Sequence, residues 1–366
     1  TRSLCDWSSD VCSSDLEGLR RLGLRGTPDN GGLRLASGSG EAPSRIFTLG
    51  DPDRVVIDLR GGSAAAIPAS GSPSSGDPER IDPRLQARLG RQILWDRLVR
   101  GVAGRRVRLN SVRVDPASAD LELRPLRRAD GMEGLSALTR LASRGNALVA
   151  INGGFFNRVR RLPLGALRER GRWLSGPILN RGAVGWEFHG LPRFDRLQLE
   201  EAVLDERGTR WPLRVLNSGY VQRGLSRYTA DWGPIYRSLS DGESAVLLRD
   251  GVVRARLEED ALSAGIPLQG EDQLLVGRAG VSPPWLPGER LRLESRPSSA
   301  VGLATNVLGG GPLLLQNGQP VLNGRAEGFG AAFLSQGAPR TVIGSDGRQL
   351  WLIKIGRAHG CTPVTQ

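Results

Sequence analysis

Short apolar runs broken by glycine-rich turns characterise the chain from about residue 107 onwards. One such run, residues 147–151, leads directly into Asn152-Gly153-Gly154 and then into Phe155-Phe156. A continuous apolar run predicts a strand buried on both faces, and Asn-Gly-Gly predicts that it stops at a sharp turn. Glycine tolerates positive φ and lacks a Cβ, so a ligand can approach the backbone N–H groups there. The alternative interpretation is a buried strand and an ordinary hairpin turn, with both phenylalanines in the core.

The stretch before this run predicts a helix followed by a hairpin. In residues 83–100 the apolar positions are three to five apart, which is typical of an amphipathic helix. Residues 107–114 and 120–126 alternate between apolar and polar side chains, which predicts two paired strands.

Two further elements have clear end signals. Residues 135–144 place leucines on one helical face, and Gly145-Asn146 ends that helix. Residues 244–248 and 252–257 are predicted to form a β-hairpin across Arg249-Asp250-Gly251.

These elements predict an α+β fold, with a mixed, mostly antiparallel sheet, flanking helices and a small β-rich fragment in front. The expected organisation is a β-rich fragment (17–62), a linker rich in Ser, Pro and Gly (63–82), a helix (83–106) and a main domain (107–355), between end segments 1–16 and 356–366.

The end segments lack the patterns of folded structure. Residues 1–16 contain Ser-Ser-Asp twice and show no helical or strand period. They resemble translated sequencing adapter, and residues 356–366 resemble the matching segment, so neither end is expected to be native. The alternative is that both are genuine disordered termini.

The composition excludes several classes of site. The formal charge is +12 and the pI about 11.0, yet Lys354 is the only lysine and the arginines are spread along the chain. No nucleic-acid-binding motif accompanies them, so a nucleic-acid partner is not expected. The three cysteines lie in the end segments and there are two histidines, so neither a metal site nor a Ser–His triad is expected. No cofactor is expected, and no apolar run reaches the roughly 18 residues of a membrane span.

Five segments occur in the order seen in one enzyme family: Asn152-Gly-Gly-Phe-Phe156, Arg181-Gly-Ala-Val-Gly185, Tyr228-Thr-Ala-Asp-Trp-Gly233, Gly309-Gly-Gly-Pro-Leu-Leu314 and Ala338-Pro-Arg-Thr-Val-Ile-Gly344. Together they resemble the phosphodiester glycosidase family over roughly residues 107–355. The vertebrate member of that family removes N-acetylglucosamine from a sugar–phosphate–sugar linkage. The family continues past Ile355 with a helix and an Asp-Gly-Gly-Gly-Ser segment that this chain lacks, so part of the family's site is expected to be absent.

A phosphodiester site needs fixed N–H dipoles and a guanidinium that grips two oxygens. We expect the Asn152–Gly154 turn, the Gly309–Gly311 turn and Arg340 to converge at the ends of neighbouring strands. We refer to the two turns as the first and second glycine corners. Phe155 and Phe156 are expected to bound the sugar. The three glycines from Gly309 to Gly311 are expected to offer N–H groups to an anion. The resemblance adds Asn217 and Tyr228 from a ligand-facing loop. The candidate substrate-binding residues are Asn152, Gly153, Gly154, Phe155, Phe156, Asn217, Tyr228, Gly309, Gly310, Gly311 and Arg340.

Hydrolysis at the anomeric carbon also needs a carboxylate as nucleophile or base. The candidate catalytic residues are Asp231 and Asp346, although Asp346 has the position of a hairpin-turn residue. Glu327 is also available, in a glycine-rich loop.

The resemblance implies an enzyme of the cell envelope, periplasm or extracellular space that hydrolyses a sugar-1-phosphate diester. Residues 33–60 resemble the second half of an AMIN-type module, which implies peptidoglycan as a partner, although an ordinary hairpin is the competing interpretation. The alternative function is a non-catalytic wall- or glycan-binding protein.

Overall fold

The computed structural model describes residues 83–357, except residues 103, 104, 119 and 158, together with four strands nearer the N-terminus. These four strands form two antiparallel pairs. They are β1 (Leu24–Asp29), β2 (Gly32–Ser37), β3 (Arg45–Leu49) and β4 (Arg54–Asp58). The predicted β-rich fragment is therefore confirmed as strands. The end segment 1–16 and the linker 63–82 lie outside the described residues, as does the tail beyond residue 357.

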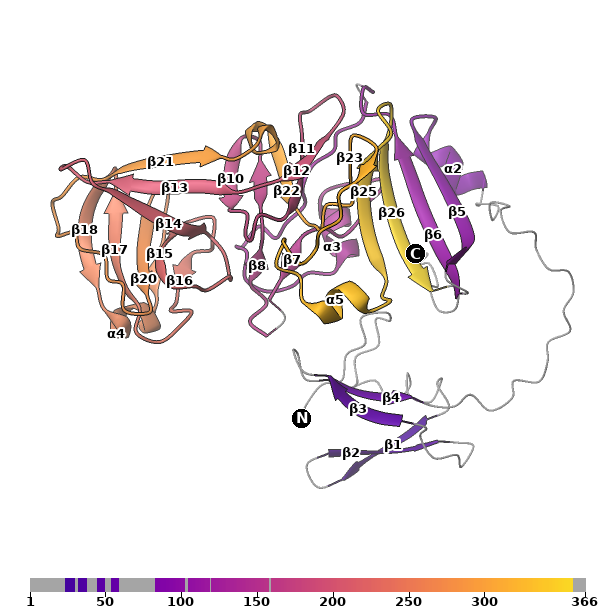
Figure 1. Ribbon diagram of the computed structural model, residues 1–366, viewed down its shortest axis with the longest axis horizontal. Helices are drawn as coiled ribbons and strands as arrows, with labels where there is room; N and C mark the ends of the chain where they lie inside the picture. Colours follow the sequence, from indigo (N-terminus) through magenta and orange to yellow (C-terminus); the bar gives the residue numbers. More distant parts are fainter. Residues whose placement is uncertain are drawn as a thin grey trace, which may run out of the picture.

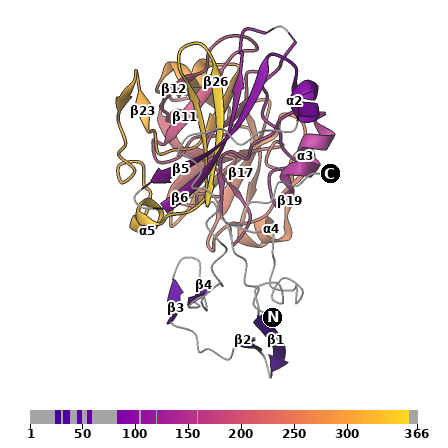
Figure 2. The same ribbon diagram turned by 90° about the vertical axis from the view of Figure 1, so that its right-hand side faces the viewer.

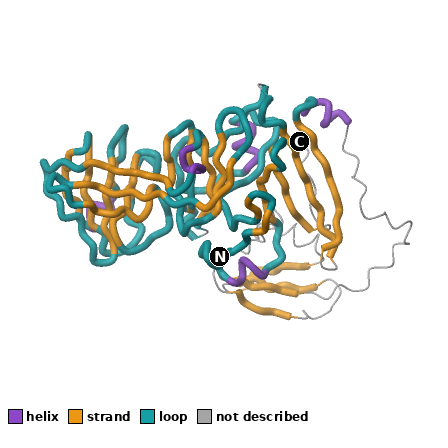
Figure 3. Tube along the Cα trace, turned by 45° about the horizontal axis from the view of Figure 1, so that its top comes forward, coloured by secondary structure: helices purple, strands orange, loops and turns teal. Residues whose placement is uncertain are grey.

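Three sheets follow one another along the long axis of the described main part (Figure 1). Strands account for most of its regular structure, and the helices are few and short (Figure 3). The predicted α+β class with a mixed, mostly antiparallel sheet is confirmed. Among the described residues, no helix has the length and apolar character needed to cross a bilayer.

The first sheet, at the left of Figure 1, has seven strands in the order β18-β17-β20-β15-β14-β13-β21. They are β13 (Leu199–Leu204), β14 (Arg210–Leu216), β15 (Gly224–Thr229), β17 (Ser244–Arg249), β18 (Val252–Leu257), β20 (Gln273–Arg278) and β21 (Arg292–Pro297). Only the β14–β15 pair is parallel.

This sheet curls back on itself. Val252 at the start of β18 bridges to Arg290, just before β21, and the Leu291 amide donates to the Gly251 carbonyl at 2.7 Å. Tyr228, Trp232 and Tyr236 lie in the apolar core that it encloses. We refer to these seven strands as the curled sheet. The predicted hairpin of residues 244–257 is confirmed within it, as β17 and β18.

The second sheet, in the centre of Figure 1, has the order β10-β9-β22-β11-β12. Its strands are β9 (Leu167–Glu169), β10 (Arg172–Ser175), β11 (Gly182–Trp186), β12 (Arg193–Arg196) and β22 (Asn306–Gly309). Beside it lies the short pair β7 (Phe155–Phe156) and β8 (Pro163–Leu164). The remaining pairs are β16 (Ile235–Tyr236) with β19 (Ile266–Pro267), and β23 (Leu315–Gln316) with β24 (Gln319–Pro320). The 3-10 helix η1 (Ala300–Leu303) precedes β22.

The third sheet, nearest the viewer in Figure 2, has the order β25-β26-β6-β5. Its strands are β5 (Ile93–Val102), β6 (Arg105–Val114), β25 (Arg340–Ser345) and β26 (Leu350–Arg357). It joins segments from opposite ends of the main part, because β26 pairs with β6 along its full length.

The third sheet corrects two sequence predictions. The predicted helix of residues 83–106 is helical only as α2 (Pro83–Leu89), and the residues after Gln92 form β5. The apolar spacing of residues 93–99 fits a helix, but pairing with β6 over ten residues makes residues 93–102 a strand. The partners of β6 are β5 and β26, so the predicted pairing with residues 120–126 is wrong.

The run of residues 147–151 is not the buried strand that the sequence predicts. These residues form no strand, and Leu148 is 63% exposed. The first strand of this region is β7, which starts after the glycine turn. The helix before the run is confirmed as α3 (Leu138–Arg144), and Asn146 follows it with a φ of 49°. The other helices are α4 (Glu259–Ala264) and α5 (Ala331–Ser335).

Candidate functional site

The two glycine-rich segments meet in space. A Cβ on Gly153 would lie 2.5 Å from Leu308 Cδ2, and one on Gly154 would lie 3.9 Å from the Gly309 carbonyl oxygen. Thr341 Oγ1 donates to Asn152 Oδ1 at 3.0 Å, which ties the same turn to β25. The Asn152–Gly154 turn therefore lies where the central sheet meets the third sheet.

A small hollow lies beside this turn. Its wall includes Phe155, Arg181 and the glycines Gly182, Gly309 and Gly310. The other lining residues are Leu164, Gly165, Ala166, Pro177, Ile178 and Ala183. Apart from Arg181, every residue of this lining is apolar or glycine, so the guanidinium supplies its charge.

Arg181 was not among the predicted site residues. Its guanidinium carbon lies 4.1 Å from the ring centre of Phe329 and 5.4 Å from that of Phe155. Nε donates to the Glu327 carbonyl at 3.1 Å and Nη2 to the Gly328 carbonyl at 3.4 Å. Burial lowers the pKa of Arg181, against the opposing effects of Tyr220 and Glu327. Within the part of the chain that the structure describes, no carboxylate forms an ion pair with it, and the Glu327 carboxylate acts on its charge only without direct contact.

Arg340, which we expected to grip the phosphate beside the glycine corners, does not line this hollow. Its guanidinium carbon lies 4.4 Å from the ring centre of Phe333. Nη2 donates to the Phe333 carbonyl at 3.2 Å and Nη1 to the Pro339 carbonyl at 3.3 Å. Two of its nitrogens thus bond carbonyls around the end of α5. Burial lowers the pKa of Arg340.

The amides available to an anion differ from those predicted. The Gly309 amide donates to the Ala166 carbonyl at 2.7 Å and the Gly310 amide to the Gly182 carbonyl at 2.8 Å. The triple-glycine segment therefore uses two of its three N–H groups within the protein. The residues of the Asn152–Gly154 turn are exposed, and their amides form no hydrogen bond within the described residues. The first glycine corner is the one that can receive an anion.

Glu327 holds the second glycine corner in place. Its side chain is fully buried and accepts hydrogen bonds from the Gly182 amide at 2.8 Å and the Leu313 amide at 3.1 Å. Arg196 Nε donates to the same carboxylate at 3.0 Å. A Cβ on Gly311 would lie 2.7 Å from Glu327 Oε2, so only glycine fits there. With this many partners the carboxylate positions the loop and is not free to act as a base.

Asn217 and Tyr228 lie inside the protein and not on a ligand-facing loop. Both side chains are 0% exposed. Asn217 Nδ2 donates to the Leu174 carbonyl at 2.9 Å, and its Oδ1 accepts from the Thr229 amide at 2.8 Å. The Tyr228 hydroxyl donates to the Ser218 carbonyl at 2.9 Å. These contacts join β10, β14 and β15, which is a structural role.

Asp231 does not lie with the glycine corners. Arg172 Nε donates to its Oδ2 at 2.8 Å, and Arg172 belongs to the edge strand β10. Two strand spacings, roughly 10 Å, separate β10 from β22. Asp231 therefore pairs with an arginine at the far edge of the central sheet. Phe156, the remaining predicted contact, pairs with Pro163 and is half-buried.

Asp346 is a turn residue. Its Oδ1 accepts from the Gln349 and Arg348 amides at 2.8 and 2.9 Å, and its Oδ2 accepts from Trp351 Nε1 at 3.0 Å. The Gln349 amide, and next the Trp351 indole, lower the pKa of Asp346 to about 2. A carboxylate of this pKa is a weak base at neutral pH, so the geometry does not support the predicted catalytic role.

This turn gives a prediction for pH dependence. Because the folded pKa lies below the ordinary value of about 3.9, the Asp346 carboxylate stabilises the β25–β26 turn above about pH 4. That contribution is lost as the pH falls through about 2. We expect Asp346→Asn to speed hydrogen exchange of the Trp351 indole at neutral pH. The difference from wild type should disappear below about pH 2; a constant difference at all pH values would contradict the assignment.

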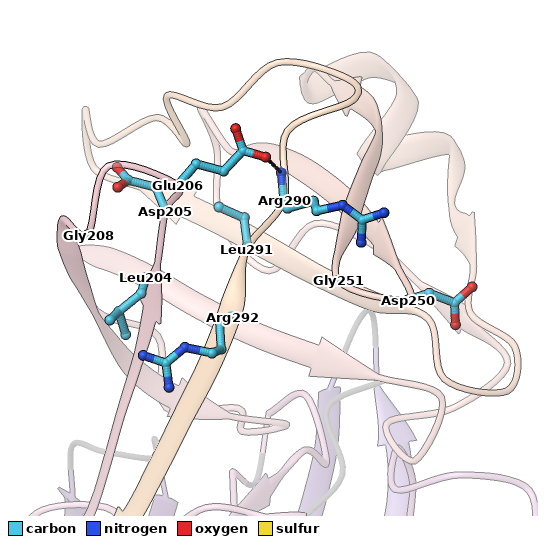
Figure 4. Close-up of a pocket in the computed structure, with 9 residues that line it drawn as sticks. All are labelled: Leu204, Asp205, Glu206, Gly208, Asp250, Gly251, Arg290, Leu291 and Arg292. Carbon is cyan, nitrogen blue, oxygen red and sulfur yellow. Dashed lines mark hydrogen bonds between the residues drawn. The ribbon is translucent and has the colours of Figure 1, made fainter.

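A second hollow, of about 410 Å³, lies at the end of the curled sheet that is far from the central sheet (Figure 4). Leu204, Asp205 and Glu206 approach it from β13, and Arg290 lies across from them. The Asp205 carboxylate is already bonded to the Trp211 indole and to backbone amides, and Glu206 Oε1 accepts from the Arg290 amide at 3.2 Å. This hollow is lined by none of the residues of the five motifs, and the acidic side chains in its lining bond to neighbouring loops. Among the described residues, no group of three His, Cys, Asp or Glu side chains suits a metal ion.

The chain is similar in structure to two solved proteins. One is a hypothetical protein from Synechocystis, with a TM-score of 0.72 and 32% identity, over 92% of this chain and 61% of that chain. The other, named "Putative exported protein" and from Burkholderia pseudomallei K96243, has a TM-score of 0.55 and 19% identity, over 70% of this chain and 62% of that chain. The second likeness concerns the fold alone. The chain spans less than two thirds of the length of each. No family model and no curated protein matches the chain.

Proposed function

We propose that the chain binds a glycosyl phosphodiester at the Asn152–Gly154 turn and contributes to its hydrolysis. The supporting observation is the partly buried guanidinium of Arg181, which has no carboxylate partner among the described residues and lies next to a turn with free amides. Amides and a guanidinium are the groups that stabilise phosphate oxygens. Phe155 forms the apolar wall against which a sugar ring packs.

The chemistry of the leaving group fits such a site. When the bond between the anomeric carbon and oxygen breaks, its electron pair goes to the departing phosphate, the oxygen of water bonds to the carbon, and the proton that the water loses goes to solvent. A phosphate monoester has a second pKa near 6, so it departs as an anion at neutral pH and does not need a proton. Stabilising the developing charge is then the main requirement, and Arg181 with the Asn152–Gly154 amides meets it.

A second candidate is binding without turnover. Asp231 pairs with Arg172, Asp346 belongs to a turn, and Glu327 is saturated with donors. Water attack needs a base or a nucleophile, and these three carboxylates are all engaged elsewhere. This observation favours a glycan-binding protein that holds the phosphodiester without cleaving it.

Hydrolysis of an N-acetylglucosamine phosphodiester by the purified chain, followed as release of reducing sugar, tests the proposal. We expect Arg181→Met to lower kcat/KM about 100-fold, the effect of removing one donor from a developing oxyanion. Arg168→Met is the matched control, because Arg168 also lies over an aromatic ring, Trp173, and bonds carbonyl oxygens of residues 302 and 304.

The outcomes separate the two candidates. Turnover that Arg181→Met and Arg168→Met reduce equally would contradict a specific role for Arg181. Tight binding of the diester without release of sugar would favour the non-catalytic protein. If the diester does not bind at all, both candidate functions are contradicted.

We also propose a location outside the cytoplasm, in the envelope, periplasm or extracellular space. The name of the Burkholderia pseudomallei protein, whose fold the chain shares, supports export. Residues 33–60, which include the pair β3–β4, resemble part of an AMIN-type module, and we propose that they bind peptidoglycan. A pull-down of residues 17–62 joined to the main part with purified peptidoglycan checks that partner.

A further inference from the structure

Two arginines and two phenylalanines form a continuous stack beside the candidate site. The rings of Phe329 and Phe333 have centres 4.7 Å apart and planes 22° apart. Arg181 lies 4.1 Å from the centre of Phe329, and Arg340 lies 4.4 Å from the centre of Phe333. One ring face accommodates one planar group at these distances, so the two guanidinium groups occupy the outer faces of the ring pair.

Phe155 fixes this arrangement from the side. Its ring centre lies 5.6 Å from that of Phe329 and 6.0 Å from that of Phe333, with planes tilted by 58° and 70°. Offset and edge-on contacts of this kind stabilise aromatic clusters. The spacing of the two arginines is therefore set by packed rings and not by flexible side chains.

Both arginines lack a contacting counter-charge in the described part of the chain. Neither Arg181 nor Arg340 forms an ion pair with a carboxylate there, although both are partly buried. Neither arginine can become neutral by losing its proton, because the pKa of a guanidinium remains above any physiological pH. Nη1 of Arg181 and Nε of Arg340 have no hydrogen-bond partner within the described residues. Each arginine thus retains a donor for an outside anion.

The separation of the two charges sets the kind of ligand. It is at most the three stacking distances of 4.1, 4.7 and 4.4 Å laid end to end. Because the stacked rings of Phe329 and Phe333 lie between the two guanidinium groups, two oxygens of one phosphate do not span them, whereas two phosphates with a sugar residue between them fit within that limit. A ligand with a single phosphodiester would pair with one of the two arginines and leave the other without an anion.

We propose that the ligand carries two anionic groups, one bound by Arg181 with the Asn152–Gly154 amides and the other by Arg340, as in a polymer of repeating glycosyl phosphates. The inference rests on the proposed function for the first phosphate, and it adds a second subsite at Arg340. Arg340 acts there as a specificity-determining residue that distinguishes a repeating polymer from a single diester.

Binding of non-hydrolysable analogues tests the inference separately from turnover. The probes are two synthetic sugar oligomers with phosphonate in place of phosphodiester, one with a single phosphonate and one with two. We expect calorimetry on the wild-type chain to show at least tenfold tighter binding of the two-phosphonate oligomer. Arg340→Gln should reduce that advantage to less than about threefold, and Arg340→Lys, which keeps the charge but loses the planar stack on Phe333, should restore only part of it. Arg168→Gln is the control for loss of a partly buried arginine elsewhere.

Three outcomes would overturn the inference. They are equal wild-type affinity for the two oligomers, equal weakening of both by Arg340→Gln, and equally tight binding of a single-stranded oligonucleotide of the same charge. The last would point to a general polyanion surface. If the oligomers bind as expected but the natural diester is not cleaved, the proposed hydrolysis fails and the second subsite stands.

Discussion

Glu327→Ala is expected to lower the free energy of unfolding by about 3–5 kcal/mol, because it removes the acceptor of three donors at once. The side chain is fully buried, and its loss leaves the Gly182 and Leu313 amides without their partner. Arg196 also loses its carboxylate, although this guanidinium is 27% exposed and part of its charge is solvated. Urea unfolding followed by circular dichroism measures the change.

The same substitution should loosen the second glycine corner. We expect faster hydrogen exchange at the Gly182 and Leu313 amides, and weaker ligand binding, because the Gly310 amide donates its hydrogen bond to the Gly182 carbonyl. Glu294→Ala is the control, because this half-exposed glutamate pairs with Arg210 and Arg292 on the surface. Exposed pairs contribute about 0–1 kcal/mol. Equal effects of the two substitutions would show that Glu327 does not organise the corner.

Glu243→Gln is expected to destabilise the curled sheet by about 3–5 kcal/mol, because it leaves a buried guanidinium without its counter-charge. Arg278 is 1% exposed and Glu243 is 0% exposed, and their Nε and Oε1 atoms lie 2.6 Å apart. The hydroxyls of Tyr228 and Tyr236 complete the network, at 3.1 and 2.8 Å from Arg278 Nη2. Burial raises the pKa of both tyrosines, so their hydroxyls remain protonated donors.

A double-mutant cycle separates the ion pair from general packing. A neutral, well-packed replacement of a buried pair is often close to neutral in stability. We therefore expect Arg278→Met added to Glu243→Gln to recover at least about 2 kcal/mol, within the range of couplings between contacting residues. Glu259→Gln is the nearby control, because this exposed carboxylate accepts only from the Gly242 amide. Simple additivity of the two core substitutions would contradict the coupled network.

The prediction of the site failed where buried contacts decide the role of a polar residue. From the sequence, Asn217 and Tyr228 are expected in a surface loop. In the structure both side chains are buried, and their polar atoms form hydrogen bonds with backbone carbonyls inside the protein. Arg181 is the first residue of one of the five segments that the sequence shows, but only the Phe155 and Phe329 rings distinguish it from dozens of other arginines. Asp346 was recognisable as a turn residue, and the structure gives it that role.

By itself, the sequence determined the elements that depend on neighbouring residues. The turn at Asp250-Gly251, where both residues have positive φ, specifies the β17–β18 hairpin through local sterics alone. The glycine corners and the strand-rich class were likewise readable, because glycine and alternation act over a few residues. Only the tertiary structure decided that residues 93–102 are a strand, since their partner β6 satisfies backbone groups that a helix would satisfy internally. It also decided that residues 147–151 stay irregular and that Arg181 shares a ring stack with Arg340, because contacts between distant segments leave no periodic trace in the chain.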